Sequence, residues 1–370
     1  MTSSLKIAEN IAHLRKKRGI TQDELASFLG VTKASVSKWE NGQSMPDIIL
    51  LPEIATYFDV SVDTLIGYEP QLSKEQIQKI YGELGENFAT LPFEEVFEKS
   101  EILVKKYHSC YLFLMQICIL WLNHYNLADG KERQHEILDK LQSLCNHILD
   151  NCRNTEIYSD VLGIRAFVDL VCGRPQDAIE GIKNMLNPRR VLNQSDSILI
   201  QAYLANGEPQ EADNFAQASI YLHLLMMVAD SCSFFDIHIG ENDICDKTIS
   251  RLDAVIDAYH LEELNLNVVA GYQYRVAAYS SLNENNEQAL MRLEKYAKIV
   301  CDMMDKGMLH GDSYFSKLDK WFEKLDLGTQ MPRSKKLVMK SARENLNNPL
   351  FDKIRDRKEF KRIEKMLDEQ

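Results

Sequence analysis

A short sequence recurs at an interval of 34 residues near the middle of the chain. Residues 172–178 read CGRPQDA and residues 206–212 read NGEPQEA, so glycine, proline, glutamine and alanine return in the same register. Glycine tolerates the positive φ of a tight turn, and proline is favoured in the first turn of a following helix. The small alanine lets neighbouring helices approach closely. The recurrence therefore predicts helical hairpins joined by glycine turns.

A period of 34 residues is that of tetratricopeptide repeats, in which stacked helix pairs bury a shared core. Looser versions of the turn occur at Ala128–Arg133 and Asn283–Ala289 but fall outside the strict period, so we expect the outer repeats to be degenerate. Only 16 glycines and 9 prolines in 370 residues also favour long helices. We predict an all-α chain with a tetratricopeptide-like superhelix; a generic α-helical bundle is the alternative for this region.

Two short helices joined by a glycine are predicted near the N-terminus. Thr21 followed by Glu24 forms the spacing of a capping box, which marks the start of a helix. Gly30 stands at the turn that follows, and Thr32 can cap a further helix over residues 33–40. This is the pattern of a helix-turn-helix, which places its second helix in the major groove of DNA.

The second of these helices has two chemically different faces. On a helical wheel Val36 and Trp39 point toward one side, as core residues would. The opposite side carries small, polar and basic side chains: Lys33, Ala34, Ser37 and Lys38. Lysine can donate to guanine, serine can donate or accept, and the alanine methyl group can contact the thymine methyl group. We predict that this side reads base edges.

Charge is distributed unevenly along the chain. The formal net charge is −12, of which residues 1–66 carry −1 and the remaining residues carry −11. Because an acidic surface repels DNA, residues 1–66 form the nucleic-acid surface that we expect.

The string ITQDELASFLGVTKASVSKWENG resembles the XRE family of lambda- and 434-repressor-like proteins, and the resemblance extends over residues 5–67. It implies a five-helix DNA-binding domain. The implied phosphate contacts are Gln22 and Asn41, and the residues implied to lie near the DNA backbone are Thr32 and Ser35. The side chains implied to face bases are Lys33, Ala34, Ser37 and Lys38. Arg15 and Glu40 would form a structural ion pair between the first and third helices.

The expected domain organisation follows from these patterns. Residues 1–68 form the DNA-binding domain, residues 69–73 form a linker in which Pro70 cannot continue a helix, and residues 74–370 form the helical repeat domain.

An XRE domain followed by degenerate tetratricopeptide helices resembles the Rgg, NprR, PlcR and PrgX group of regulators. The resemblance implies that the repeat domain binds a short signalling peptide and forms a homodimer. Candidate peptide-binding residues are polar or aromatic positions in apolar helices: Gln201, Tyr203, Asn267, Gln273, Tyr274 and Arg275. Amide side chains can pair with an extended peptide backbone. The alternative for each is surface polarity or a satisfied core polar group.

Other functions find no support in the sequence. It has no HExxH, GxSxG, Walker A or GxGxxG motif, so we expect no enzyme and no cofactor. The eight cysteines form no CxxC and show no zinc-ligand spacing, which predicts reduced thiols and no metal site. The most apolar run, Ser109–Leu122, is too short to span a bilayer and predicts a core helix. We therefore expect a cytoplasmic protein that binds no membrane.

The sequence thus predicts a DNA-binding transcription regulator. Its expected partners are a palindromic double-stranded DNA operator, a signalling peptide and a second copy of the chain, with RNA polymerase as a further candidate. The alternative is a repeat scaffold whose N-terminal bundle binds protein rather than specific DNA.

Overall fold

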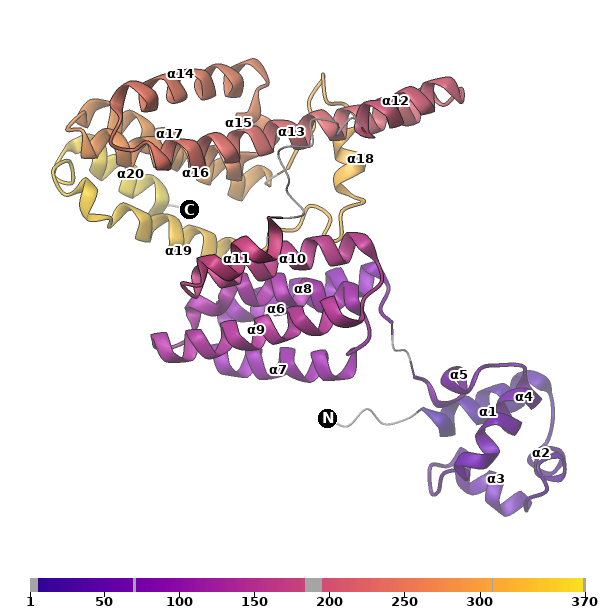
Figure 1. Cartoon of the computed structure of the whole chain (residues 1–370). Helices are drawn as coiled ribbons and strands as arrows, with labels where there is room; N and C mark the ends of the chain where they lie inside the picture. The colour runs from indigo at the N-terminus through magenta and orange to yellow at the C-terminus, as the bar shows by residue number, and fades with distance from the viewer. Residues whose placement is uncertain (1–5, 69–70, 184–194, 308, 369–370) are drawn as a thin grey trace. The chain divides into compact units, whose positions relative to one another are not determined.

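The computed structural model describes residues 6–68, 71–183, 195–307 and 309–368 (Figure 1). The regular structure in these ranges is helical, apart from an isolated antiparallel bridge between Asn265 and Leu309, so the prediction of an all-α fold is confirmed. The chain divides into two compact units, which are described separately: Met1–Ser73 with Leu103–Cys110, and Lys74–Ile102 with Tyr111–Gln370. The predicted linker residue Pro70 lies outside the described residues.

Residues 6–68 of the first unit form five short α-helices and one 3-10 helix: α1 (Ile7–Arg18), α2 (Gln22–Phe28), α3 (Lys33–Glu40), η1 (Ile48–Leu50), α4 (Leu51–Phe58) and α5 (Val62–Ile66). Side chains from all five α-helices meet in one core, at Ile11, Leu25, Val36, Ile54 and Leu65.

Local signals in the sequence set the ends of these helices. Thr21 accepts from the backbone N–H of Glu24, and the Glu24 carboxylate accepts from the backbone N–H of Thr21, so the predicted capping box is present. Gly19 ends α1 in the left-handed conformation at φ 72°. At the other end of the unit, the Asn10 side chain donates to backbone oxygens of Thr64 and Leu65, which ties α1 to α5.

The second unit is a succession of longer helices. Its first part comprises α6 (Lys74–Thr90), α7 (Phe93–Lys106), α8 (Tyr111–His124), η2 (Tyr125–Leu127), α9 (Lys131–Asn151), α10 (Thr155–Val171) and α11 (Pro175–Ile182). The helices that follow are α12 (Ser195–Ala205), α13 (Pro209–Ile237), α14 (Asn242–Ala258), α15 (Leu261–Leu264), α16 (Leu266–Leu282), α17 (Asn286–Lys306), α18 (Leu318–Phe322), α19 (Lys335–Leu346), η3 (Pro349–Phe351) and α20 (Lys358–Asp368).

The recurrent sequence forms the same turn twice. Gly173 and Gly207 have φ values of 71° and 79°, and Pro175 and Pro209 begin α11 and α13. The alanines three residues after the prolines are both buried: Ala178 and Ala212. The predicted glycine turns are therefore present, and they join α10 to α11 and α12 to α13.

The looser versions of the turn differ from each other. In the Asn283–Ala289 turn, Glu284 takes the left-handed position at φ 59°, and Asn285 donates its backbone N–H to Ser280, five residues back, as Arg174 does to Asp169. At Ala128–Arg133, Gly130 has φ 81° and ψ 149°, which is not the left-handed helical conformation. It follows the 3-10 helix Tyr125–Leu127. The first therefore preserves the turn without glycine, and the second is a different connection.

Two apolar helices bear on the question of a membrane. Helix α8 is largely buried, as predicted for the run Ser109–Leu122. Among the described residues, α13 is long and apolar enough to cross a bilayer by length and composition, and 33% of its most apolar window is buried. Core helices of globular proteins can have the same length and apolar composition. Helix α13 packs against α12, α14, α16 and α18.

Candidate nucleic-acid interface

Helix α3 presents the predicted recognition residues on its outer side. Val36 and Trp39 are buried in the core of the first unit. Lys33, Ala34 and Lys38 are exposed, and Ser37, on the same side of the helix, is half-buried. The structure therefore brings the four predicted base-facing side chains onto the side of α3 that faces away from the core.

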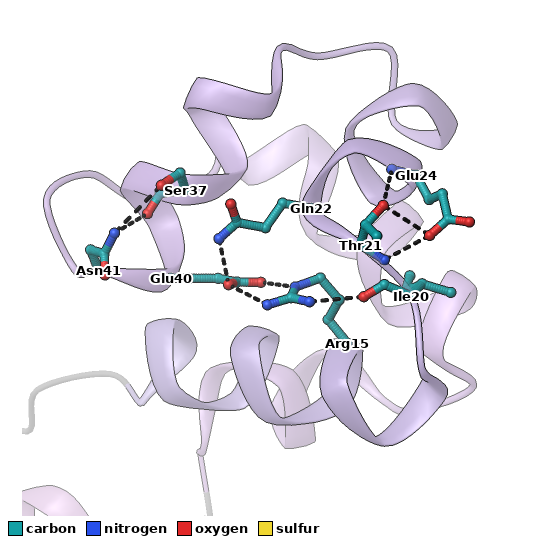
Figure 2. A network of polar contacts seen from close by, with 8 residues as sticks. All are labelled: Arg15, Ile20, Thr21, Gln22, Glu24, Ser37, Glu40 and Asn41. Atoms are coloured by element: carbon teal, nitrogen blue, oxygen red, sulfur yellow. Dashed lines mark hydrogen bonds and ion pairs between the residues drawn. The ribbon is translucent and has the colours of Figure 1, made fainter.

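An ion pair fixes α3 to α1. The Arg15 Nε atom lies 2.5 Å from Glu40 Oε1, and Arg15 Nη2 donates to Glu40 Oε2 at 2.9 Å (Figure 2). Arg15 Nη1 also donates to the backbone oxygen of Ile20 at 2.8 Å, so the guanidinium holds α1, α3 and the turn between α1 and α2 together. These are the two residues for which the family resemblance implied a structural pair.

The titration of Glu40 reflects these contacts. Burial acts to raise the pKa of Glu40, but hydrogen bonds from Arg15 and Gln22 and the positive charge of Arg15 outweigh burial, so the pKa lies below its usual value. The hydrogen bond to Glu40 raises the pKa of Arg15 in turn. Both groups are therefore held in their charged forms.

The carboxamide of Gln22 belongs to the same cluster. Gln22 Nε2 donates to Glu40 Oε2 at 2.9 Å, a contact that joins the start of α2 to the end of α3 (Figure 2). A carboxamide nitrogen has two N–H groups, so this contact orients Gln22 and leaves one donor for a phosphate. Sequence reasoning missed the contact, because nothing local links residues 18 positions apart.

The remaining predicted backbone contacts lie at the two ends of α3. Thr32 caps the helix by accepting from the backbone N–H of Ser35, and the two hydroxyl groups lie 2.9 Å apart. At the other end, Asn41 Nδ2 donates to the backbone oxygen of Ser37 at 2.9 Å (Figure 2). The N-terminus of α3, at Thr32 and Ser35, offers backbone N–H groups and a partial positive charge to anions, which suits the predicted position of these two residues near the DNA backbone.

Two further features of the first unit bear on DNA. The last turn of α1 carries exposed Lys16, Lys17 and Arg18, which supply positive charge. The segment after α3 exposes three large apolar side chains, Met45, Ile48 and Ile49. Sequence analysis did not single out these three, since their exposure depends on how the loop leaves the core.

The structure separates the candidate peptide-binding residues. Gln201 and Tyr203 lie on α12, whereas the other four lie on α16. Gln273 is buried and lines a cavity of about 490 Å³. Tyr274 and Arg275 line a different cavity, of about 420 Å³. Successive residues on a helix point about 100° apart, so neighbours in sequence reach different surfaces.

Contacts within the chain explain part of the polarity of α16. The Tyr274 hydroxyl group donates to the backbone oxygen of Asn345 at 3.2 Å, and Arg275 pairs with Asp236 at 2.9 Å. Asn267 is exposed. These residues therefore do not form one continuous site with Gln273.

Comparison with known proteins places the first unit in a family. A helix-turn-helix family model matches residues 11–65. The transcriptional regulator SinR of Bacillus licheniformis is 37% identical over 76 residues, which cover 19% of this chain and 68% of that protein. The transcriptional activator BcrR of Enterococcus faecalis is 30% identical over 83 residues, 21% of this chain and 41% of that protein. The chain therefore belongs to the helix-turn-helix family.

The curated relatives match a short part of the chain, and a solved structure aligns over nearly all of it. The chain spans about half the length of the first curated relatives that it matches. A crystal structure of Bacillus thuringiensis PlcR with a peptide and DNA aligns over 99% of both chains, with 13% sequence identity and a TM-score of 0.28.

Proposed function

We propose that the protein is a sequence-specific DNA-binding transcription regulator that acts in the cytoplasm. The observation that carries this proposal is the outer side of α3, where Lys33, Ala34, Ser37 and Lys38 lie on a helix anchored by Trp39 and by the Arg15–Glu40 pair. A rigid helix with small and basic side chains can enter the major groove and donate to base edges.

The residues around α3 would position the domain on the DNA backbone. Gln22 and Asn41 would donate to phosphates from opposite ends of the helix-turn-helix, with Thr32 and Ser35 close by. Phosphate contacts set register and orientation but carry no sequence information. Base preference would therefore come from α3 alone.

We further propose that the chain acts as a homodimer through its second unit and responds to a short peptide. A two-fold protein reads a palindromic site, so inverted half-sites would lie a whole number of helical turns apart, in steps of about 10 bp. A peptide controls DNA binding only if it favours one arrangement of the dimer over another. The helical hairpins of the second unit support this proposal, since stacked hairpins present extended binding surfaces.

A footprint on the DNA upstream of the encoding gene, at moderate salt, tests the proposal. We expect protection of two inverted half-sites and a dimer in light scattering at micromolar concentration. Protection of one asymmetric site by a monomer would contradict the dimer. Binding that is equal on all sequences would favour the alternative, a scaffold whose first unit binds protein.

A further inference from the structure

A cavity of about 490 Å³ opens among α14, α15, α16 and α17 of the second unit. Its volume lies in the range of small-ligand sites. Polar and charged side chains dominate its lining: Asp253, Asp257, His260, Glu262, Glu263, Gln273 and Lys295. His260, between α14 and α15, has the left-handed conformation at φ 48°, which is unusual for a residue other than glycine.

A buried arginine orients the wall of this cavity. Arg292 is 5% exposed and makes two hydrogen bonds to the Asp253 carboxylate, through Nη1 at 2.8 Å and Nη2 at 2.5 Å. Arg292 Nη1 also donates to Gln273 Oε1 at 3.0 Å, and the Tyr272 hydroxyl group donates to Asp253 at 2.9 Å. Asp253 is thus committed to neighbours within the chain. These four residues are called the Arg292 cluster below.

The Arg292 contact leaves a donor at the cavity. Arginine has no acceptor, so the oxygen of the Gln273 carboxamide must face Arg292 and its nitrogen must face elsewhere. Gln273 is 1% exposed and lines the cavity. In the described part of the chain the hydrogen bond from Arg292 is the one that this carboxamide makes, so both N–H groups of Nε2 can still donate. Because Gln273 lines the cavity, water or a ligand oxygen there can accept from this donor.

Three carboxylates around the cavity also lack partners. Within the described residues, no cation lies within ion-pair distance of Asp257, Glu262 or Glu263. Lys295 and His260 are the residues of the lining that can carry positive charge. The site therefore combines an acidic rim, which attracts a cation, with an amide donor at the cavity wall, which can donate to an oxygen.

We propose that this cavity binds an α-ammonium group together with its adjacent carbonyl oxygen, as found at the amino end of a peptide or in a free amino acid. The ammonium group would lie among Asp257, Glu262 and Glu263, and the carbonyl oxygen would accept from Gln273 Nε2. A ligand with both groups satisfies both halves of the site, whereas a diamine satisfies only the rim. This inference rests on the proposed function, because an effector peptide would enter this cavity with its amino end first.

Calorimetry on the full-length protein with four probes tests the chemistry. The probes are pentaalanine amide with a free amino end, its N-acetylated form, free alanine, and putrescine. We expect the free-amino pentapeptide to bind about tenfold or more tightly than the acetylated form, since one charged hydrogen bond is worth at least that factor. Alanine that binds as tightly as the pentapeptide would identify free amino acids as the source. Equal binding of the two pentapeptides, or no heat with either, overturns the proposal.

Variants separate the site from the overall charge of the protein. Glu262→Gln with Glu263→Gln changes two exposed rim residues, and we expect about tenfold weaker binding of the free-amino pentapeptide. Glu211→Gln with Asp230→Asn makes the same change in charge on exposed positions of α13 and serves as the control. Equal weakening by both pairs would reveal only long-range attraction and would contradict the site.

Gln273→Met tests the buried donor, because methionine has similar volume and cannot donate. We expect it to weaken the pentapeptide and to leave putrescine unaffected, whereas equal losses for both probes would contradict the donor role. DNA binding without peptide is measured on the same proteins. Loss of the site with intact DNA binding leaves the regulator proposal standing, and failure of the wild-type protein to select DNA sequences would instead refute that proposal.

Discussion

Each unit of the chain contains an arginine that joins helices through a carboxylate and lies beside a glutamine. In the Arg15 cluster (Arg15, Gln22 and Glu40), the glutamine donates to the carboxylate, and Arg15 donates through Nε, Nη1 and Nη2. In the Arg292 cluster, the glutamine accepts from the arginine, and Arg292 Nε is buried without a partner in the described residues.

This difference in hydrogen bonding corresponds to a difference in the proposed functions of the two clusters. In the Arg15 cluster every nitrogen of the arginine donates, which holds the members in one geometry and suits a helix that must fit the major groove. The Arg292 cluster keeps a free amide donor at a cavity, where a ligand oxygen can accept from it. The first cluster therefore explains rigidity in the proposed DNA-binding unit, and the second explains the proposed ligand site.

The largest expected loss of stability tests whether the core of the first unit unfolds independently of the second unit. Trp39→Ala should destabilise the first unit by about 3–5 kcal/mol, because it removes a large buried side chain. Hydrogen exchange on the full chain should show lost protection in α1–α5 and retained protection in α14–α17. The control Phe28→Ala alters an exposed ring and should change little. Unchanged protection of α1–α5 in Trp39→Ala would contradict this core.

The next effect compares the two carboxylates directly. Glu40→Ala should destabilise its unit by about 2–3 kcal/mol, since the Arg15 and Glu40 side chains are 14% and 7% exposed and the arginine loses its partner. Asp253→Ala should destabilise the second unit at least as much, because it leaves Arg292, whose side chain is 6% exposed, without its carboxylate partner. Urea unfolding of both variants measures the difference. A loss of less than about 1 kcal/mol in either variant would show that the remaining arginine is solvated after the substitution.

A smaller effect is the loss of stability of the first unit at low pH. Because the pKa of Glu40 is lowered in the folded state, its stabilising contribution is complete above the unfolded-state value near 4.5 and is lost as the pH falls through the lower folded value. The urea midpoint of the first unit should therefore fall below about pH 4.5. Glu40→Gln should be less stable at pH 6 and should show a flatter acid dependence. A wild-type dependence as flat as that of Glu40→Gln would show that the pair contributes nothing.

The smallest expected loss of stability comes from replacing a turn glycine, and it should be equal in the two units. Gly30→Ala and Gly207→Ala each place a side chain at positive φ, 66° and 79°, and no atom lies within 4 Å of the added Cβ. Only backbone strain then remains, so each should cost about 1–2 kcal/mol. Thermal unfolding of the two variants checks this. A much larger loss of stability at one position would show that the added side chain disturbs packing there and not only the backbone conformation.

The sequence predicted features that depend on neighbouring residues. The capping box at Thr21 and Glu24 and the turns at Gly173 and Gly207 follow from residue type and short spacing, so they could be recognised directly. The buried and exposed sides of α3 follow from helical periodicity. The Arg15–Glu40 pair came only from the resemblance to a family.

Contacts between distant helices could not be predicted. Gln22 and Glu40 are 18 positions apart, and Asp253 and Arg292 are 39 positions apart, so their contacts depend on how helices pack. Gln273 was singled out because it is polar in an apolar helix, but its neighbour Tyr274 faces another cavity. The direction of each side chain around the helix axis therefore decides which of these candidate residues share a cavity.

The most direct test of the central claim is a binding selection from random-sequence DNA with the wild-type protein and four single variants. Lys33→Ala and Lys38→Ala should each weaken binding by about 1–3 kcal/mol and relax base preference at different positions of the half-site. Gln22→Ala and Asn41→Ala should weaken binding to all sequences alike, since phosphates carry no code. If both lysine variants kept the wild-type base preference, α3 would not be the helix that reads DNA.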